Sequence, residues 1–240
     1  SQGTHYAILH LPGYGQGFHD LSAFMNEQTE RIDLALCVRG HGISADQFRP
    51  GFGIPGIWGY QICNQDSIAY RGVYMDALRA VDFLYSRPEV DHRRIGTIGG
   101  SQGGGLALLA AALRPKQVAA CAFFDPFPCD IRHQTAIRTI WETELKNYLA
   151  YYPNCCTYED ALCIQDLLNI RSFAPQIHCH VHFATGLFDD DCPPHGSFTL
   201  YNSIPSSNKQ YTVYPHDSHI GESNYTQMLL EWFDKLFTSL

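Results

Sequence analysis

The stretch IGTIGGSQGGG, residues 95–105, decides how the rest of the chain is interpreted. Its centre, Gly99 to Gly103, fits the pattern Gly-x-Ser-x-Gly around Ser101. The apolar residues before it predict a short strand, and the Ala/Leu-rich segment after it predicts a helix that ends before Pro115. A serine between a strand and a helix is the context of a nucleophile elbow. Side chains at the flanking glycines would collide with neighbouring backbone, which favours this sharp turn over a glycine-rich loop with an accidental serine.

Outward from this turn, apolar runs and helical periodicities alternate along the chain. Such alternation predicts an α/β fold, with a mostly parallel central sheet covered by helices on both faces. The expected strands are 6–11, 32–38, 95–98, 118–124, 180–185 and 210–214, and the expected helices are 73–85, 106–113, 197–201 and 225–237.

Residues 131–169 interrupt the alternation with helical stretches at 141–149 and 159–168. We interpret them as a small helical insertion and not as a second folding unit, so a single α/β-hydrolase domain is expected over residues 1–240. A chain of 240 residues with 45% hydrophobic residues can bury one sizeable core.

Charge and hydropathy exclude several classes of partner. The formal net charge is −8 and basic residues do not cluster, which argues against nucleic acid, because phosphate binding needs grouped Lys and Arg. The apolar run 106–113 is too short to span a membrane. The first residues lack a basic region followed by an apolar one, so a signal peptide is not visible.

The nine cysteines are odd in number and irregularly spaced, unlike a disulfide framework. This usage favours a reducing compartment, and we expect the cytoplasm. Cys155-Cys156 and Cys192 are the candidates for a single bridge.

A serine hydroxyl needs a base to take its proton, and in this fold the base follows the last strand. His219 lies directly after the strand 210–214 and before the closing helix. His216 is the competitor in the same loop. We prefer His219, because it lies deeper in the loop.

The orienting acid is expected at a strand end between the serine and the histidine. Asp189, Asp190 and Asp191 follow the strand 180–185. Asp189 is nearest to the strand end and is our choice, whereas the other two fit a solvated turn. Asp125, which follows an earlier strand, is a further candidate, although Pro126 behind it suggests a turn.

Acyl transfer also needs donors for a tetrahedral oxyanion. We assign them to the backbone amides of Gln102, directly after the serine, and Tyr14, in the glycine-flanked loop after the first strand.

Three histidines at every second position could instead indicate a zinc site. His178, His180 and His182 share one face of a strand. This strand should be covered on both faces, so neither a metal nor a cofactor is expected.

Three segments together resemble the acetyl xylan esterases and cephalosporin-C deacetylases, the seventh carbohydrate-esterase family. They are residues 70–76 (YRGVYMD), 90–96 (VDHRRIG) and 99–104 (GGSQGG), and residues 186–189 (GLFD) also resemble that family's acid loop. The resemblance implies an α/β-hydrolase fold and a cofactor-free serine esterase.

The same resemblance implies the site and its substrates. Ser101, Asp189 and His219 would form the triad, and the amides of Tyr14 and Gln102 the oxyanion hole. The expected reaction removes acetyl groups from xylo-oligosaccharides and other small esters such as cephalosporin C. The insertion resembles the family segment that narrows the pocket and joins subunits into ring-like hexamers, so a homo-oligomer is expected.

Three departures from the family pattern stand out. The family's Arg-Gly-Gln is here Arg39-Gly40-His41, and its His-Glu pair is His219-Ile220. The family's N-terminal extension is largely missing before Ser1, which suggests a fragment, a processed form or a shortened relative. The first two are expected to leave the triad chemistry intact while changing the support of the loops.

Two other functions fit parts of the pattern. A peptidase or a dienelactone-type hydrolase shares Gly-x-Ser-x-Gly-Gly, and a non-catalytic binding protein could retain the fold. If the chain acts on sugars, aromatic side chains at Phe52, Trp58, Tyr60 and Trp141 are candidates for a stacking wall.

Overall fold

The computed structural model describes residues 5–18, 30–47, 56–136, 140–219 and 224–240. These residues form a six-stranded sheet in the order β2-β1-β3-β4-β5-β6, and every neighbouring pair of strands is parallel. The strands are β1 (His5–Leu11), β2 (Ile32–Ala35), β3 (Val90–Gly100), β4 (Ala120–Phe124), β5 (His180–Gly186) and β6 (Lys209–Tyr214). The predicted α/β fold is confirmed.

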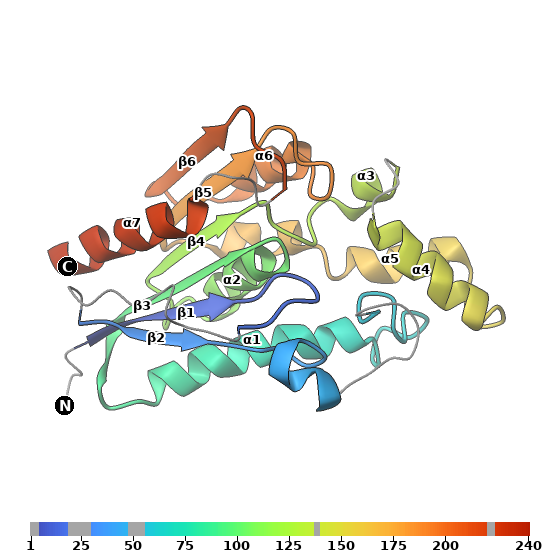
Figure 1. Cartoon of the computed structure of the whole chain (residues 1–240), viewed down its shortest axis with the longest axis horizontal. Helices are drawn as coiled ribbons and strands as arrows, with labels where there is room; N and C mark the ends of the chain where they lie inside the picture. The colour runs from blue at the N-terminus through green and yellow to red at the C-terminus, as the bar shows by residue number, and fades with distance from the viewer. Residues whose placement is uncertain (1–4, 19–29, 48–55, 137–139, 220–223) are drawn as a thin grey trace.

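Helices cover both faces of this sheet (Figure 1). On one face α1 (Ala69–Tyr85), α2 (Gln102–Leu113) and α6 (Pro194–Ser203) contribute to the larger apolar core. On the other face α7 (Tyr225–Ser239) packs its apolar side against β1, β3, β4 and β5. Short 3-10 helices occupy connections: η2 (Gly42–Gln47), η3 (Ile170–Ser172) and η4 (Ala174–Gln176).

The helical insertion consists of α3 (Ile131–Ala136), α4 (Ile140–Tyr151) and α5 (Tyr158–Asp166). These helices lie together beyond the carboxyl ends of the strands (Figure 1). A capping box starts α5, because the Thr157 hydroxyl accepts from the Asp160 amide and the Asp160 carboxylate accepts from the Thr157 amide. The insertion is therefore placed at the edge of the sheet where sites of this fold class are built.

Two strand boundaries differ from the predicted ones. β2 ends at Ala35 instead of residue 38, and β3 begins at Val90 instead of residue 95. The early part of β3 is polar, so the apolar pattern from which a strand is predicted begins only at residue 95. Asp91 supports it by accepting hydrogen bonds from the Arg93 amide (3.0 Å) and the Arg94 guanidinium (2.8 Å).

The predicted cysteine pairing is only partly correct. Cys155 forms a disulfide, but its partner is Cys63, 92 residues earlier, while Cys156 and Cys192 are free. Cys63 lies in the turns before α1, and its partner Cys155 lies in the insertion, between α4 and α5. Spacing in the sequence does not encode such a long-range pairing.

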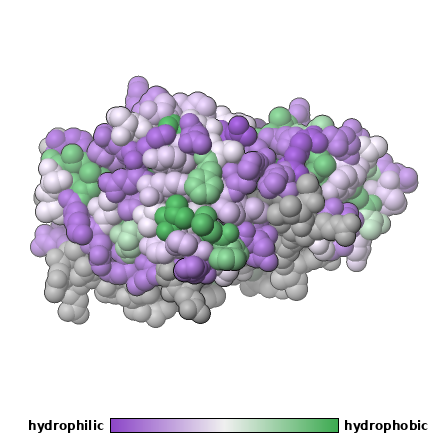
Figure 2. All heavy atoms as spheres, turned by 90° about the horizontal axis from the view of Figure 1, so that it is seen from above, coloured by the Kyte–Doolittle hydropathy of each residue, from purple (hydrophilic) through white to green (hydrophobic). Residues whose placement is uncertain are grey.

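The surface seen from above, over β6 and α6, is mostly hydrophilic, with apolar residues in small separate patches (Figure 2). None of the helices among the described residues is long and apolar enough to cross a membrane.

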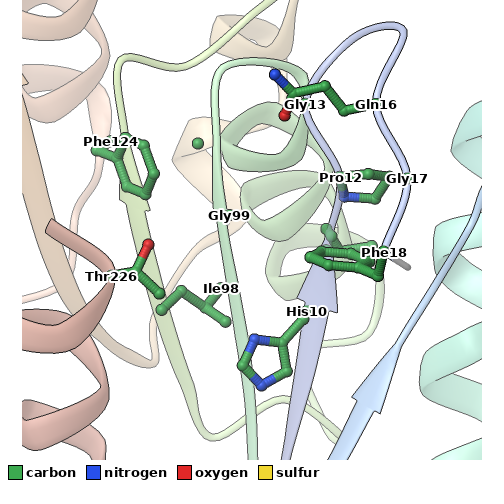
Figure 3. A pocket seen from close by; sticks show the side chains of 12 residues that line it. His10, Pro12, Gly13, Gln16, Gly17, Phe18, Ile98, Gly99, Phe124 and Thr226 are labelled. Atoms are coloured by element: carbon green, nitrogen blue, oxygen red, sulfur yellow. The ribbon is translucent and has the colours of Figure 1, made fainter. Parts of the chain in front are cut away.

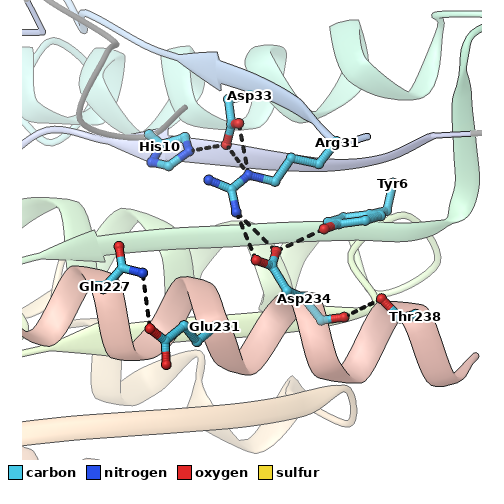
Figure 4. Close-up of polar contacts among 8 residues, drawn as sticks. All are labelled: Tyr6, His10, Arg31, Asp33, Gln227, Glu231, Asp234 and Thr238. Atoms are coloured by element: carbon cyan, nitrogen blue, oxygen red, sulfur yellow. Dashed lines mark hydrogen bonds and ion pairs between the residues drawn. The ribbon is translucent and has the colours of Figure 1, made fainter. Parts of the chain in front are cut away.

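A buried polar network joins β1, β2 and α7 (Figure 4). The Arg31 guanidinium, 3% exposed, donates to Asp33 at 2.9 Å and to Asp234 at 3.0 Å. His10 contacts the same Asp33 carboxylate at 2.6 Å, and the Tyr6 hydroxyl donates to Asp234 at 2.8 Å. One cation thus holds two carboxylates from distant segments, which fixes the closing helix against the first two strands.

We predict that Arg31→Met lowers the free energy of unfolding by about 3 kcal/mol, since it leaves two partly buried carboxylates without their shared cation. The matched control is Arg79→Met, which removes an arginine that is 77% exposed and should cost less than about 1 kcal/mol. Urea unfolding monitored by circular dichroism measures both. Equal losses in the two variants would contradict the structural role given to Arg31.

Candidate active site

Ser101 occupies the sharp turn between β3 and α2 that the motif predicts. Its backbone is in the left-handed region, at φ 54° and ψ −124°, which is strained for a residue with a side chain. A Cβ on Gly99 would lie 2.4 Å from the Gly103 carbonyl carbon, and one on Gly103 would lie 2.1 Å from the Leu11 carbonyl oxygen. The expected steric reason for both glycines is confirmed.

Hydrogen bonds from β4 and its following loop fix this turn. The Ser101 amide donates to the Phe124 carbonyl at 3.0 Å, and the Ser101 carbonyl accepts from the Phe127 amide at 2.9 Å. The tertiary structure therefore holds Ser101 in place against the strain of its backbone.

Asp189 and His219 meet at the carboxyl ends of β5 and β6. The His219 Nδ1 atom lies 2.8 Å from Asp189 Oδ2, while Asp189 Oδ1 accepts from the amides of Asp191 (2.9 Å) and Cys192 (2.7 Å). With its Nδ1–H donated to the carboxylate, the imidazole keeps the Nε2 lone pair as a proton acceptor. Asp189 is buried, whereas Asp190 and His216 are exposed, so these competitors are not in this pair.

Asp125 is a second buried carboxylate behind this pair, not the partner of the histidine. Its Oδ1 atom accepts from the Thr185 hydroxyl at 2.9 Å and from the Gly186 amide at 3.1 Å. Burial, followed by the neighbouring Asp189 charge, raises the pKa of Asp125 to about 6. Asp125 thus holds the end of β5, from which the acid loop starts.

Cys192 is a neighbour that the sequence did not identify. One side-chain atom each of Cys192, Asp189 and His219 lies within 4.8 Å of the other two, and the Ser101 side chain is a neighbour of the Cys192 thiol. Ser101 and His219 therefore both lie against the same thiol. Burial, followed by the nearby Asp189 and Asp125 charges, raises the pKa of Cys192 well above its usual range, so this sulfur stays a neutral thiol.

The two amides assigned to the oxyanion hole lie in adjoining segments. Gln102 begins α2, where first-turn amides have no partner within the helix. Its side-chain Nε2 donates to the Pro12 carbonyl at 3.3 Å, which ties the start of α2 to the loop carrying Tyr14. Among the described residues, neither the Tyr14 amide nor the Gln102 amide has an acceptor, as donors awaiting an oxyanion require.

His41, one of the departures, supports this loop from behind. It is buried, its Nδ1 contacts the Arg39 carbonyl at 2.9 Å, and its Nε2 lies 3.2 Å from Gln102 Nε2. An Nδ1–H donated to the carbonyl leaves Nε2 to accept from the Gln102 amide group. Burial lowers the pKa of His41, consistent with that neutral form. The other departure, Ile220, lies outside the described residues.

Glu144 of α4 is a further residue that sequence reasoning missed. Its buried carboxylate accepts from the Tyr14 hydroxyl at 2.7 Å and from the Gly56 amide at 3.2 Å, and the Trp58 amide donates to the same Tyr14 oxygen at 2.8 Å. Burial raises the pKa of Glu144, although these donors counteract it. The insertion thereby holds the loop that carries Tyr14.

Two of the four residues expected to form an aromatic wall, Trp58 and Trp141, are buried, whereas Tyr60 is half-buried. Trp58 is 0% exposed, and Trp141 is buried with its ring stacked on Phe127 at a centroid distance of 3.7 Å. The Trp141 Nε1–H donates to the Asp191 carbonyl at 3.3 Å, so this ring joins α4 to the acid loop. Both tryptophans are therefore core residues around the site, and Phe52 lies outside the described residues.

A cavity of about 250 Å³ opens beside the elbow on the α7 face of the sheet (Figure 3). His10, Ile98, Phe124 and Thr226 surround it, and Gly99 and Gly100 form part of its wall. Ser101, Asp189 and His219 do not line it.

Among the described residues, two groups place three metal-ligating atoms close together. One is Asp189, Cys192 and His219, where the carboxylate and imidazole already bind each other and the thiol is protonated. The other consists of three cysteines, two of them joined in the disulfide. His178, His180 and His182 belong to neither group, and His182 Nε2 instead contacts the Thr212 hydroxyl at 3.0 Å.

The family model "Acetyl xylan esterase (AXE1)" matches residues 1–236. The acetyl esterase Axe7A of Xylanibacter ruminicola is 32% identical over 185 residues, which are 72% of this chain. The chain spans only 38% of the length of that relative.

Two solved structures share the fold closely. The acetyl xylan esterase from Paenibacillus sp. R4 superposes with a TM-score of 0.85 at 29% identity, covering 98% of this chain and 75% of that one. Acetyl xylan esterase 1 from Thermoanaerobacterium sp. JW/SL YS485 gives 0.84 at 26% identity, covering 99% and 76%.

The ionisation of His219 should control the reactivity of Ser101. Burial lowers the pKa of His219, but the hydrogen bond and charge of Asp189 outweigh it, so the pKa is raised above 6.5. The base is lost when it gains a proton. We therefore predict that the rate of Ser101 labelling by a fluorophosphonate falls as the pH drops, with a midpoint above pH 6.5.

Asp189→Asn should slow this labelling by roughly three to four powers of ten and move the midpoint to lower pH. Asp190→Asn, the exposed neighbour, serves as the control and should change neither quantity. A flat pH profile in the unmodified protein would contradict the role of His219.

Proposed function

Because the chain belongs to the acetyl xylan esterase family, we propose that it is a serine carboxylesterase that removes acetyl groups from acetylated xylo-oligosaccharides and other small acetyl esters. The observation that carries this proposal is the Asp189–His219 hydrogen bond at the carboxyl edge of the sheet, beside the strained turn that holds Ser101.

In the proposed acylation step, His219 Nε2 takes the proton of Ser101 as its oxygen attacks the acetyl carbonyl carbon. The amides of Tyr14 and Gln102 stabilise the oxyanion of the tetrahedral intermediate. Asp189 keeps the imidazole in the required tautomer and stabilises its protonated form. The protonated histidine then donates its proton to the departing alcohol oxygen, and the acetyl group remains on Ser101.

Deacylation repeats the sequence with water. His219 removes a proton from a water molecule, which attacks the acetyl-serine carbonyl, and the same two amides stabilise the second oxyanion. Collapse of this intermediate returns the proton to Ser101 and releases acetate.

The surroundings of Ser101 support a small acyl group. Ser101 is only 3% exposed, so a long acyl chain has little open space at the nucleophile. Helix α4 contacts both sides of the site, through Glu144 to Tyr14 and through Trp141 to the Asp191 carbonyl. An insertion held at two points narrows the approach and favours acetyl over longer esters.

Initial rates on a panel of esters test this proposal. We predict that p-nitrophenyl acetate is hydrolysed at least ten times faster than p-nitrophenyl octanoate, since about 1.4 kcal/mol of steric cost in the transition state gives that ratio. Acetylated xylo-oligosaccharides and cephalosporin C should lose acetate, as recorded by product masses.

Ser101→Ala should abolish all of these activities, whereas Ser197→Ala, a buried serine of α6, provides the comparison for altered packing. Faster cleavage of peptide anilides than of acetyl esters would instead support the peptidase alternative. Hydrolysis of none of these esters by the intact protein would support a binding protein that retains the fold.

A further inference from the structure

Three sulfur atoms meet where the insertion packs against the segment before α1. Cys63 and Cys155 are joined in the disulfide, and the free Cys156 Sγ lies 2.7 Å from Cys63 Sγ. All three sulfurs lie within 4.8 Å of one another. A covalent S–S bond measures about 2.05 Å, so Cys156 stands close to bonding distance from a sulfur that already has a partner.

The disulfide crosses the same contact that positions Tyr14. Cys63 follows the segment containing Trp58, while Cys155 and Cys156 lie in the turn between α4 and α5. Noncovalent contacts cross this interface too: the Gly56 amide donates to Glu144, and a Cβ on Gly59 would lie 3.0 Å from the Glu144 carbonyl oxygen. Packing therefore keeps the three sulfurs together whichever pair is bonded.

We propose that Cys63, Cys155 and Cys156 form a thiol–disulfide exchange site, at which Cys155 is released for modification by small disulfides. The Cys156 thiolate attacks Cys63 Sγ, the Cys63–Cys156 bond forms, and Cys155 leaves as a thiolate that takes up a proton. No electrons are gained or lost in this step. The bridge between the insertion and the segment before α1 is retained, because both alternative partners lie in the same turn.

The second step consumes an external disulfide of low molecular weight. The Cys155 thiolate attacks one of its sulfur atoms, a mixed disulfide forms on Cys155, and the other half leaves as a thiolate. Exposure favours this residue, since Cys155 is exposed whereas Cys156 is half-buried. The outcome is a chain that keeps its internal bridge and carries one added group on its surface.

Protonation keeps the first step slow near neutral pH. Burial, with the Asp160 carboxylate adding to it, raises the pKa of the Cys156 thiol, and the thiolate is the form that attacks. The Tyr148 hydroxyl on α4 also lies near the Cys156 thiol. The experiment is therefore carried out at mildly alkaline pH.

The test incubates the unreduced protein with glutathione disulfide, digests it without reduction and identifies linkages from fragment spectra. We expect both Cys63–Cys155 and Cys63–Cys156 bonds, with glutathione on Cys155 and at least tenfold less on Cys156. Cys156→Ser should retain the Cys63–Cys155 bond and lose glutathione at Cys155. Cys155→Ser should contain the Cys63–Cys156 bond.

Cys163→Ser is the matched control, because Cys163 is an exposed thiol of α5 outside the three-sulfur site. This variant should lose only the glutathione attached at position 163, and the disulfide bonds made by Cys63 should be unchanged. The proposal is overturned if Cys155→Ser keeps Cys63 and Cys156 as free thiols, or if the unmodified protein carries only the Cys63–Cys155 bond and no glutathione on Cys155. It is equally overturned by a bond between Cys155 and Cys156.

Discussion

The left-handed backbone at Ser101 is the constraint on which the rest of this structure depends. Ser101 has a positive φ, which glycine adopts readily and a residue with a side chain adopts only under strain. The surrounding backbone leaves no room for a Cβ on Gly99 or Gly103. Hydrogen bonds between the Ser101 amide and carbonyl and the segment 124–127 offset this backbone strain. The strained turn places the Ser101 hydroxyl at the carboxyl edge of the sheet, next to the first amides of α2.

Groups from distant parts of the chain reach the same edge of the sheet as that turn. Asp189 and His219 arrive from the ends of β5 and β6, and Tyr14 arrives from the end of β1. The parallel sheet makes this convergence natural, since all six strands end at the same edge. The insertion then adds Glu144, whose buried carboxylate holds the Tyr14 hydroxyl and thereby orders the loop. The same insertion is bonded to the segment before α1 through the disulfide.

Much of this could be predicted from the sequence, because its strongest signals are local. The elbow motif depends on five consecutive residues, and the positions of Asp189 and His219 follow from the order of strands in the fold. Glu144, Cys192 and the Cys63–Cys155 bond could not be predicted in this way. Each contacts a residue far away in the chain, and nothing in the neighbouring residues distinguishes Glu144 from an exposed acid on a helix. Trp58 and Trp141 were candidates for a stacking wall, but both are buried. The sequence alone does not distinguish an aromatic residue that lines a site from one that belongs to the core.

The central claim is that Ser101 carries the acyl group during turnover, and trapping that intermediate tests it most directly. The protein is mixed with p-nitrophenyl acetate, quenched in acid during turnover and digested for mass spectrometry. The account predicts a single acetyl group on the peptide that contains Ser101, and its absence from His219→Ala treated in the same way. Acetylation of a different residue that keeps pace with turnover, or full activity in Ser101→Ala, would contradict it.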